Sequence, residues 1–178
     1  MLITLTGMMG CGKSSVGRAL ALWLGVPFRD LDEVIRQRTG KTILEIFAEG
    51  GEPAFRQLEQ EALEAVLSEE SIQGVLALGG GTVTTPECAQ LIRERTWCVY
   101  LRTRPETLLR RLSDLTDGRP LLQTGDRMGR ISFLLEQRAP LYESVAHLVI
   151  DTDDDSIENL VLKIGNGIIF AEKQPKRT

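Results

Sequence analysis

The chain has 178 residues, the size of one ordinary domain, and its 42% hydrophobic and 26% charged residues are typical of a soluble globular protein. Its net charge of −4 and pI near 5.2 argue against a general nucleic-acid binder, which carries a basic stripe or domain. No hydrophobic run approaches the roughly 20 residues of a membrane span, so we expect neither nucleic acid nor membrane as a partner.

The cysteines and the N-terminus indicate the compartment. Cys11, Cys88 and Cys98 are odd in number and lack metal-like spacing, which favours reduced thiols. The opening MLITLTG lacks the basic region and cleavage site of a signal peptide and predicts a buried strand. We therefore expect a cytoplasmic protein. The single histidine, His147, opens an apolar run, which favours a structural role over a catalytic one.

Short apolar runs alternate along the chain with longer amphipathic stretches. Strands are expected within residues 2–6, 27–32, 74–81, 97–102 and 147–151. Helices are expected at 13–24, across 32–68 with breaks near 40 and 50–51, at 85–95, from 104, from about 127 to about 138, and at 155–164. Strands that alternate with helices predict the α/β class, here a three-layer α/β/α fold around a central five-stranded parallel sheet.

Capping residues support these helix boundaries. Gly25 is expected to end the first helix, and Thr85 is expected to cap a helix with Pro86 in its first turn. Asp155, with Glu158 three residues further on, predicts a capping box at the last helix.

Residues 113–126 combine glycine, proline and polar residues without a clear period, and we interpret them as a mobile lid. The chain shows no repeat and no linker. We therefore expect a single domain over residues 1–170, followed by a disordered tail at 171–178.

The segment GMMGCGKS, residues 7–14, fits the phosphate-binding pattern G-x-x-x-x-G-K-[ST]. It lies between an expected strand and an expected helix, whose positive N-terminal end favours an anion. Lys13 is expected to reach the β- and γ-phosphates of a nucleotide, and Ser14 to offer its hydroxyl to Mg²⁺. GTPases, motor ATPases and small-molecule kinases share this motif, so it does not name the acceptor.

Two further segments should lie at the same edge of the sheet, since ligands of such folds bind at the carboxyl ends of the strands. Asp30 and Asp32 are two residues apart on a stretch expected to be extended, so they should point the same way. A kinase needs one carboxylate near Mg²⁺ and one near the attacking hydroxyl, although a solvated, helix-capping Asp is the plainer alternative. Gly79, Gly80 and Gly81 indicate either close backbone approach to a ligand or a tight turn.

Arginines complete the pattern. Arg56 in FRQLE and Arg138 in QRAPLYE together could clamp a small carboxylate, because a guanidinium group pairs with it through two parallel hydrogen bonds. Arg119 lies in the expected lid, where it could close over ATP. The residues alone thus predict a magnesium-dependent P-loop kinase of a small, anionic, hydroxylated molecule.

In the order and spacing of its motifs the chain resembles the shikimate kinases, which have the nucleoside-monophosphate-kinase-like fold. The resemblance runs from residue 2 to about residue 151 and rests on GMMGCGKSSVGRALA, DLDEVI, FRQLE, LGGG, RPLL and RAPLYE. It implies transfer of a phosphoryl group from ATP to the 3-hydroxyl of shikimate, in the biosynthesis of chorismate and aromatic amino acids. ATP and shikimate would be the small-molecule partners and Mg²⁺ the cofactor, and we expect a monomer.

The resemblance also implies a role for each matching residue. The ATP-binding residues would be Gly10, Cys11, Gly12, Lys13, Ser14, Ser15, Arg110 and Arg119. The shikimate-binding residues would be Asp32, Arg56, Gly79, Gly80, Gly81 and Arg138. Lys13, Asp32 and Arg119 would be catalytic, with Asp32 orienting or deprotonating the attacking hydroxyl. Ser14 would bind Mg²⁺ directly and Asp30 mostly through water. Either Arg110 or Arg111 would stack on adenine.

Other interpretations stay open at this point. A gluconate kinase would also act on a small hydroxylated acid, but the ordered set of motifs opposes it. A GTPase-type switch usually carries an N/TKxD motif, which the sequence lacks. A non-catalytic module that binds a nucleotide or an acid is opposed by the intact Lys13, Ser14, Asp30 and Asp32.

Overall fold

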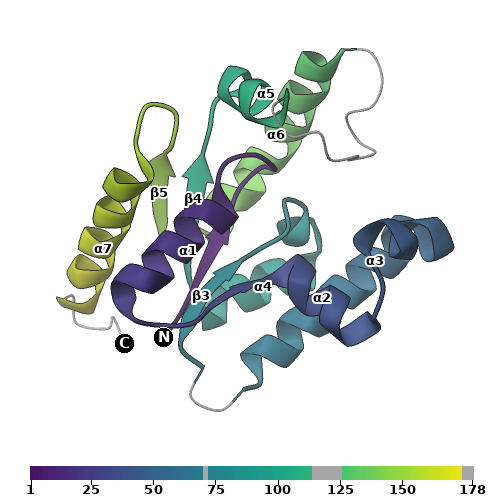
Figure 1. The fold of residues 1–178 in the computed structure, drawn as a ribbon, viewed down its shortest axis with the longest axis horizontal. Coiled ribbons are helices and arrows are strands. Elements are labelled where there is room, and N and C mark those ends of the chain that lie inside the picture. The colour runs from purple at the N-terminus through teal and green to yellow at the C-terminus, as the bar shows by residue number, and fades with distance from the viewer. Residues whose placement is uncertain (70–71, 114–125, 174–178) are drawn as a thin grey trace.

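The computed structural model describes residues 1–69, 72–113 and 126–173. Within them, five parallel strands form one sheet in the order β2-β3-β1-β4-β5, with helices on both faces (Figure 1). The strands are β1 (Leu2–Thr6), β2 (Phe28–Asp30), β3 (Gly74–Ala77), β4 (Trp97–Arg102) and β5 (Leu148–Asp151). The predicted α/β class and five-stranded parallel sheet are confirmed.

The helices follow the predicted order. They are α1 (Lys13–Leu24), α2 (Leu31–Thr39), α3 (Ile43–Leu67), α4 (Pro86–Arg95), α5 (Pro105–Ser113), α6 (Arg127–Val145) and α7 (Ile157–Lys173), with a short 3₁₀ turn η1 (Thr82–Thr84). Gly25 ends α1 in the left-handed conformation, and Thr85 precedes Pro86 at the start of α4, as predicted. The predicted breaks are also present, at Gly40 and at Gly51.

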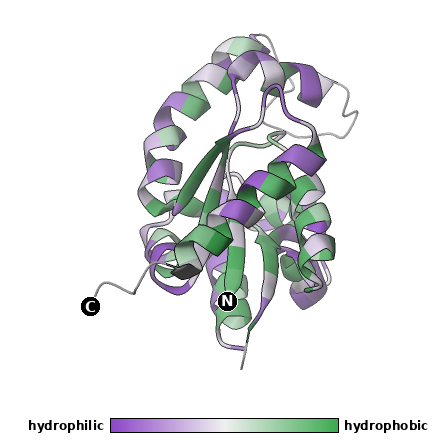
Figure 2. Ribbon diagram, turned by 90° about the vertical axis from the view of Figure 1, so that its left-hand side faces the viewer, coloured by the Kyte–Doolittle hydropathy of each residue, from purple (hydrophilic) through white to green (hydrophobic). Residues whose placement is uncertain are grey.

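Alternation along the strands produces the three layers, because successive side chains point to opposite faces of a sheet. Leu76 and Tyr100 pack into a hydrophobic cluster with α2, α3 and α4, whereas their neighbours Val75 and Val99 join a second cluster with α1, α5 and α7. Figure 2 shows the resulting pattern, with hydrophobic strands between helices whose outward sides are hydrophilic. The sheet is thus buried on both faces, as parallel sheets are.

One helix extends further than the sequence indicated. We expected it to end near Arg138, shortly before Pro140, but α6 continues through Pro140 to Val145. Pro140 removes the donor to the carbonyl of Glu136, and both residues are exposed, so water can take the place of the missing N–H. Arg138 therefore lies inside a helix.

The start of the last helix also differs from the prediction. Ser156 caps α7 by accepting a hydrogen bond from the backbone N–H of Asn159 at 3.2 Å, whereas Asp155 forms an ion pair with Lys163 instead. The proposed capping box at Asp155 is therefore wrong. The helix runs on to Lys173, beyond residue 170 where we placed the domain boundary, and residues 174–178 lie outside the described residues.

The cysteines and the histidine occupy structural positions. All three cysteines are free and buried, and burial raises the pKa values of Cys88 and Cys98 to about 12. His147 and Cys98 exchange two hydrogen bonds, of 3.1 Å from the Cys98 N–H to Nδ1 and 2.7 Å from the His147 N–H to the Cys98 carbonyl. Among the described helices, none has the length and hydropathy needed to cross a membrane.

Candidate active site

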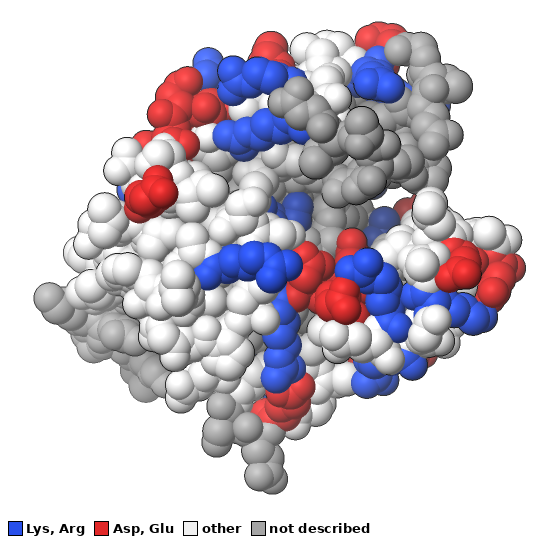
Figure 3. All heavy atoms as spheres, in the orientation of Figure 1, with Lys and Arg blue, Asp and Glu red and all other residues white. Residues whose placement is uncertain are grey.

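A cavity of about 970 Å³ opens where the strands end, at their carboxyl edge. The phosphate loop and the start of α1 form one side, and α3, residues 79–81 and α6 form the other. In the space-filling view of Figure 3, basic and acidic side chains are interleaved over the face shown, and basic side chains are visible inside its central hollow. This cavity brings together most of the residues that the sequence singled out.

The phosphate loop folds tightly between β1 and α1. Gly10 and Gly12 have φ values of 82° and 101°, in a region that side chains rarely adopt. Within the loop, the ammonium group of Lys13 donates to the carbonyls of Gly7 and Met8 at 2.8 and 3.0 Å. The charge of Lys13 is thus held at the N-terminal end of α1, where an anion is also stabilised by the helix dipole.

Ser14 and Asp30 bring a hydroxyl and a carboxylate together. Ser14 Oγ donates to Asp30 Oδ2 at 2.8 Å, and Asp30 Oδ1 caps α2 by accepting from the backbone N–H of Asp32 at 3.1 Å. We predicted that Asp32 lies on an extended stretch, but β2 ends at Asp30 and Asp32 is helical. Both carboxylates nevertheless line the cavity.

These oxygens fit Mg²⁺, which prefers oxygen ligands and is commonly held by one or two protein groups together with substrate phosphates. The described residues contain no group of at least three His, Cys, Asp or Glu side chains that would cage a metal ion. A hydroxyl and a carboxylate beside a phosphate loop therefore suit magnesium delivered with a nucleotide.

At the other end of the cavity, α3 presents an ion pair. Gly51 (φ 68°, ψ −167°) breaks this helix. Arg56 follows this break by five residues, and its Nη1 donates to Glu59 Oε2 at 2.6 Å. The Glu59 side chain is fully buried, and its other oxygen accepts from Thr82 Oγ1 at 2.6 Å. Burial alone would lower the pKa of Arg56, but Glu59 and Glu52 outweigh that effect and raise it.

Residues 79–81 are glycines because space is short, not because their backbone is left-handed. A Cβ at Gly79 would lie 2.5 Å from Glu59 Oε1, one at Gly80 would lie 3.2 Å from the Met9 nitrogen, and one at Gly81 would overlap the Arg56 guanidinium group. The segment forms a hydrogen-bonded turn, in which the Thr82 N–H donates to the Gly79 carbonyl at 3.3 Å, so the tight-turn interpretation is confirmed. The groups that crowd this turn are the protein's own.

Arg138 reaches the same glycines from α6. Its Nη1 donates to the carbonyl of Gly80 at 3.2 Å, and the hydroxyl of Tyr142 donates to the same carbonyl. Arg56 and Arg138, 82 positions apart in the sequence numbering, therefore contact adjacent glycines and line one cavity. Their positions are consistent with the prediction that these two arginines together clamp a small carboxylate.

Of the two arginines expected to face adenine, only one lines the cavity. Arg110 is exposed and is not among the residues that line the cavity, whereas Arg111 lines it. Arg111 Nη2 donates to the Thr152 carbonyl at 2.8 Å, and Nη1 to the Cys11 carbonyl at 3.3 Å. Arg119 and the lid interior lie outside the described residues.

Sequence reasoning missed Glu59, Thr82 and Tyr142. Two of them stand in motifs that we had already noted, since Glu59 follows Arg56 by three residues and Tyr142 follows Arg138 by four. Residues at these spacings are neighbours on a helix surface, so the motifs could have indicated them.

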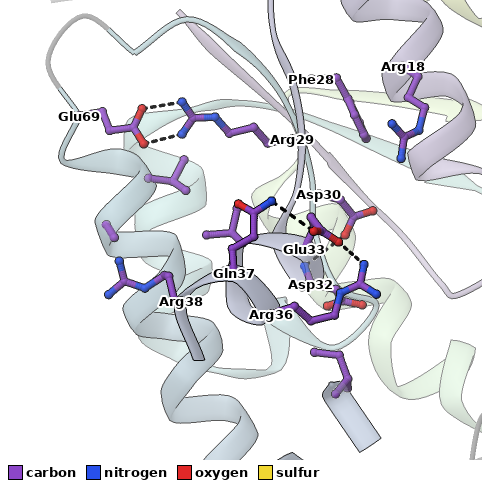
Figure 4. A pocket seen from close by; sticks show the side chains of 14 residues that line it. Arg18, Phe28, Arg29, Asp30, Asp32, Glu33, Arg36, Gln37, Arg38 and Glu69 are labelled. Atoms are coloured by element: carbon purple, nitrogen blue, oxygen red, sulfur yellow. Dashed lines mark hydrogen bonds and ion pairs between the residues drawn. The ribbon is translucent and has the colours of Figure 1, made fainter. Parts of the chain in front are cut away.

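A second cavity of about 840 Å³ lies beside β2, between α1, α2 and α3 (Figure 4). It shares Asp30 and Asp32 with the first cavity. Most of its other charges are paired with one another, namely Arg29 with Glu69 and Arg36 with Glu33, and the amide of Gln37 also donates to Glu33. Because it has neither a phosphate loop nor glycines, we place the chemistry in the first cavity.

The fold and this cavity define a P-loop phosphotransferase, with a phosphate loop at one end and an arginine-lined site for a small acid at the other. The family model for shikimate kinase matches residues 9–168. The chain belongs to the shikimate kinase family.

Individual relatives agree with this assignment. A shikimate kinase of Thioalkalivibrio sulfidiphilus is 46% identical over 162 residues, covering 91% of this chain and 84% of the relative. One of Thermus thermophilus is 44% identical over 162 residues, covering 91% and 86%. Among solved structures, shikimate kinase from Acinetobacter baumannii in complex with shikimate has a TM-score of 0.88 and 38% identity, covering 98% of this chain and 95% of that one.

Proposed function

We propose that the protein transfers the γ-phosphoryl group of ATP to the 3-hydroxyl of shikimate and releases ADP and shikimate 3-phosphate. One observation carries the proposal. A single cavity holds a phosphate loop at one end and Arg56 and Arg138 at the other. Asp32 lies between them. Its backbone N–H donates a hydrogen bond to Asp30 Oδ1, and its own Oδ1 lies 3.7 Å from the position that a Cβ would take on Gly79. The shikimate bound to the Acinetobacter baumannii relative supports the same acceptor.

At the nucleotide end, the loop amides and Lys13 would hold the β- and γ-phosphates of ATP. Lys13 would exchange the carbonyls of Gly7 and Met8 for phosphate oxygens, so its charge acts where negative charge develops in the transition state. We assign Arg111 to the adenine, because it lines the cavity and Arg110 does not. Arg119 would close over the nucleotide.

Mg²⁺ would be held by Ser14 Oγ directly and by Asp30 through water, since these two groups already share a hydrogen bond. When bound, the ion neutralises charge on the β- and γ-phosphates. The protein's own part is to keep the hydroxyl and the carboxylate side by side.

At the acid end, Arg56 and Arg138 would bind the carboxylate of shikimate, and the backbone of residues 79–81 would bind a ring hydroxyl. Asp32 would orient the attacking hydroxyl and accept its proton. The ion pair with Glu59 holds the guanidinium group of Arg56 in place before the substrate binds. This lowers the entropy that is lost when the side chain is ordered on binding.

We also propose that the enzyme is a single-domain, cytoplasmic monomer. The described residues of this chain supply both the phosphate loop and the arginines that line the cavity, which fits a monomer. The three free, buried thiols fit a reducing compartment.

The test is ADP release by the purified protein with Mg·ATP and shikimate, gluconate or no acceptor. We expect release with shikimate alone, and ³¹P and ¹H NMR of the product should place the phosphate on the 3-hydroxyl. A folded Lys13→Ala variant is the control for contaminating kinases. Release with gluconate instead would preserve the kinase but refute the acid assignment. ATP binding without release would favour the non-catalytic module.

A further inference from the structure

The carbonyl of Gly80 accepts hydrogen bonds from two side chains of α6. Arg138 Nη1 lies 3.2 Å from this oxygen, and the hydroxyl of Tyr142 is the second donor. The two residues are four positions apart and are therefore neighbours on one face of the helix. One of them lines the cavity, and the other does not.

Tyr142 is fixed from several sides. Its side chain is fully buried, its ring lies 5.1 Å from that of Tyr100, and its hydroxyl also lies 3.9 Å from the sulfur of Met8. Burial raises the pKa of Tyr142, so the hydroxyl keeps its proton and remains a donor. The carbonyl of Gly80 is thus held by a group that belongs to the rigid core.

The orientation of the Gly80 carbonyl also fixes the orientation of the next backbone N–H. In a trans peptide unit the C=O of one residue and the N–H of the next point in opposite directions, so the Gly80 carbonyl determines where the Gly81 N–H points. The carbonyl faces α6, and Arg56 lies against Gly81. This one peptide group is therefore bonded by Arg138, and Arg56 lies beside its second residue.

We infer that Tyr142 is a positioning residue for the acid substrate, which holds the Gly80–Gly81 peptide so that Arg138 and the Gly81 N–H can both face shikimate. The inference rests on the proposed function. If the Tyr142 hydroxyl were removed, Arg138 would be the only side chain among the described residues that still donates to the part-buried Gly80 carbonyl. The substrate carboxylate and the Gly80 carbonyl would then compete for the same guanidinium group, because an unsatisfied buried acceptor is costly.

The test compares Tyr142→Phe with Tyr100→Phe, a matched control. Tyr100 is also buried, and within the described chain it makes no hydrogen bond to Gly80. For Tyr142→Phe we expect the KM for shikimate to rise about 10-fold, as one lost buried hydrogen bond permits, and the KM for ATP to stay within about twofold. Tyr100→Phe should leave both constants unchanged.

A merely structural role predicts another result. An equal rise in both KM values, or a lower melting temperature with an unchanged KM for shikimate, would overturn the inference. Wild-type protein that does not phosphorylate shikimate would overturn the proposed function as well. Turnover by the wild type together with an unaffected Tyr142→Phe would overturn this inference alone.

A second measurement does not depend on the folding of Tyr142→Phe. The chain has two tyrosines, so uniform 3-fluorotyrosine labelling gives two ¹⁹F signals, which Tyr100→Phe assigns. Shikimate is expected to move the Tyr142 signal of the labelled wild-type chain. A Tyr142 signal that stays in place at saturating shikimate would contradict the inference.

Discussion

The two ends of the cavity are built in different ways. The nucleotide end comes chiefly from one continuous segment, residues 7–15, whose backbone and Lys13 form the proposed phosphate site. The acid end is assembled from α3, η1 and α6, and its parts contact one another through side chains. A local site can be recognised from one motif, whereas an assembled site depends on contacts between distant parts of the chain.

The two ends also differ in how their charges are supported. Lys13 is held chiefly by the backbone carbonyls of Gly7 and Met8, with a longer contact of 3.8 Å to Cys11 Sγ. Arg56 is held by the fully buried Glu59, whose second oxygen is in turn bound by Thr82. Loss of one member of a buried ion pair leaves an uncompensated charge, so the acid end should be the more sensitive of the two to substitutions away from the substrate.

The largest expected effect lies at the nucleotide end. Lys13→Ala should reduce kcat at least about 100-fold, because the ammonium group acts where the transition state develops charge. The melting temperature should change little, since the hydrogen bonds of Lys13 are confined to the phosphate loop. Steady-state kinetics and thermal unfolding measure the two effects. Near-normal turnover in the folded variant would rule out the phosphate-loop mechanism.

A smaller effect is expected at the acid end. Glu59→Ala should lower the free energy of unfolding by about 3 kcal/mol, because it leaves Arg56 without its buried partner. We also expect the KM for shikimate to rise about 10-fold while the KM for ATP is unchanged. A displaced Arg56 guanidinium group cannot pair with the substrate carboxylate through two hydrogen bonds.

Glu59→Gln is the matched control, because it keeps the shape of the side chain and its capacity to bind Arg56 and Thr82. It should fall between the wild type and Glu59→Ala in both denaturant unfolding and shikimate kinetics. If Glu59→Ala raised both KM values equally, the acid end would not be the separate unit described above.

The smallest effect distinguishes two neighbouring arginines. Arg111→Lys should raise the KM for ATP about fivefold, because a point charge cannot keep all three hydrogen bonds, two to Thr152 and one to Cys11, that hold the guanidinium group. Arg110→Lys is the control and should behave as the wild type. The opposite outcome, with Arg110 the sensitive residue, would reverse our assignment of the adenine-facing side chain.

The sequence was most informative where structure is local. The glycine-rich loop, Lys13 and Ser14 followed from one motif, and alternating apolar runs predicted the sheet. The one-residue ambiguity between Arg110 and Arg111 was not local, because adjacent helical residues point about 100° apart and the contact that separates them involves Thr152, 41 residues further on. Asp32 was misplaced because its neighbour Asp30 caps a helix, which turns the chain out of the extended conformation.

Glu59 shows why the acid end could not be completed from sequence. A glutamate three residues after an arginine on a helix is usually a solvated surface pair of little consequence. Here the bond to Thr82, 23 residues away, and the space left by Gly79 make it a buried group. Neither observation is available before the chain is folded.

The crowding around residues 79–81 bears on the design of inhibitors. A compound that hydrogen-bonds to the peptide groups of this segment would meet a surface with little freedom to mutate. Any side chain at Gly81 would displace Arg56, and one at Gly79 would meet Glu59 at 2.5 Å. Substitutions that evade the compound would therefore disturb the arginine and glutamate of the proposed carboxylate site, so we expect drug resistance to arise elsewhere in the cavity.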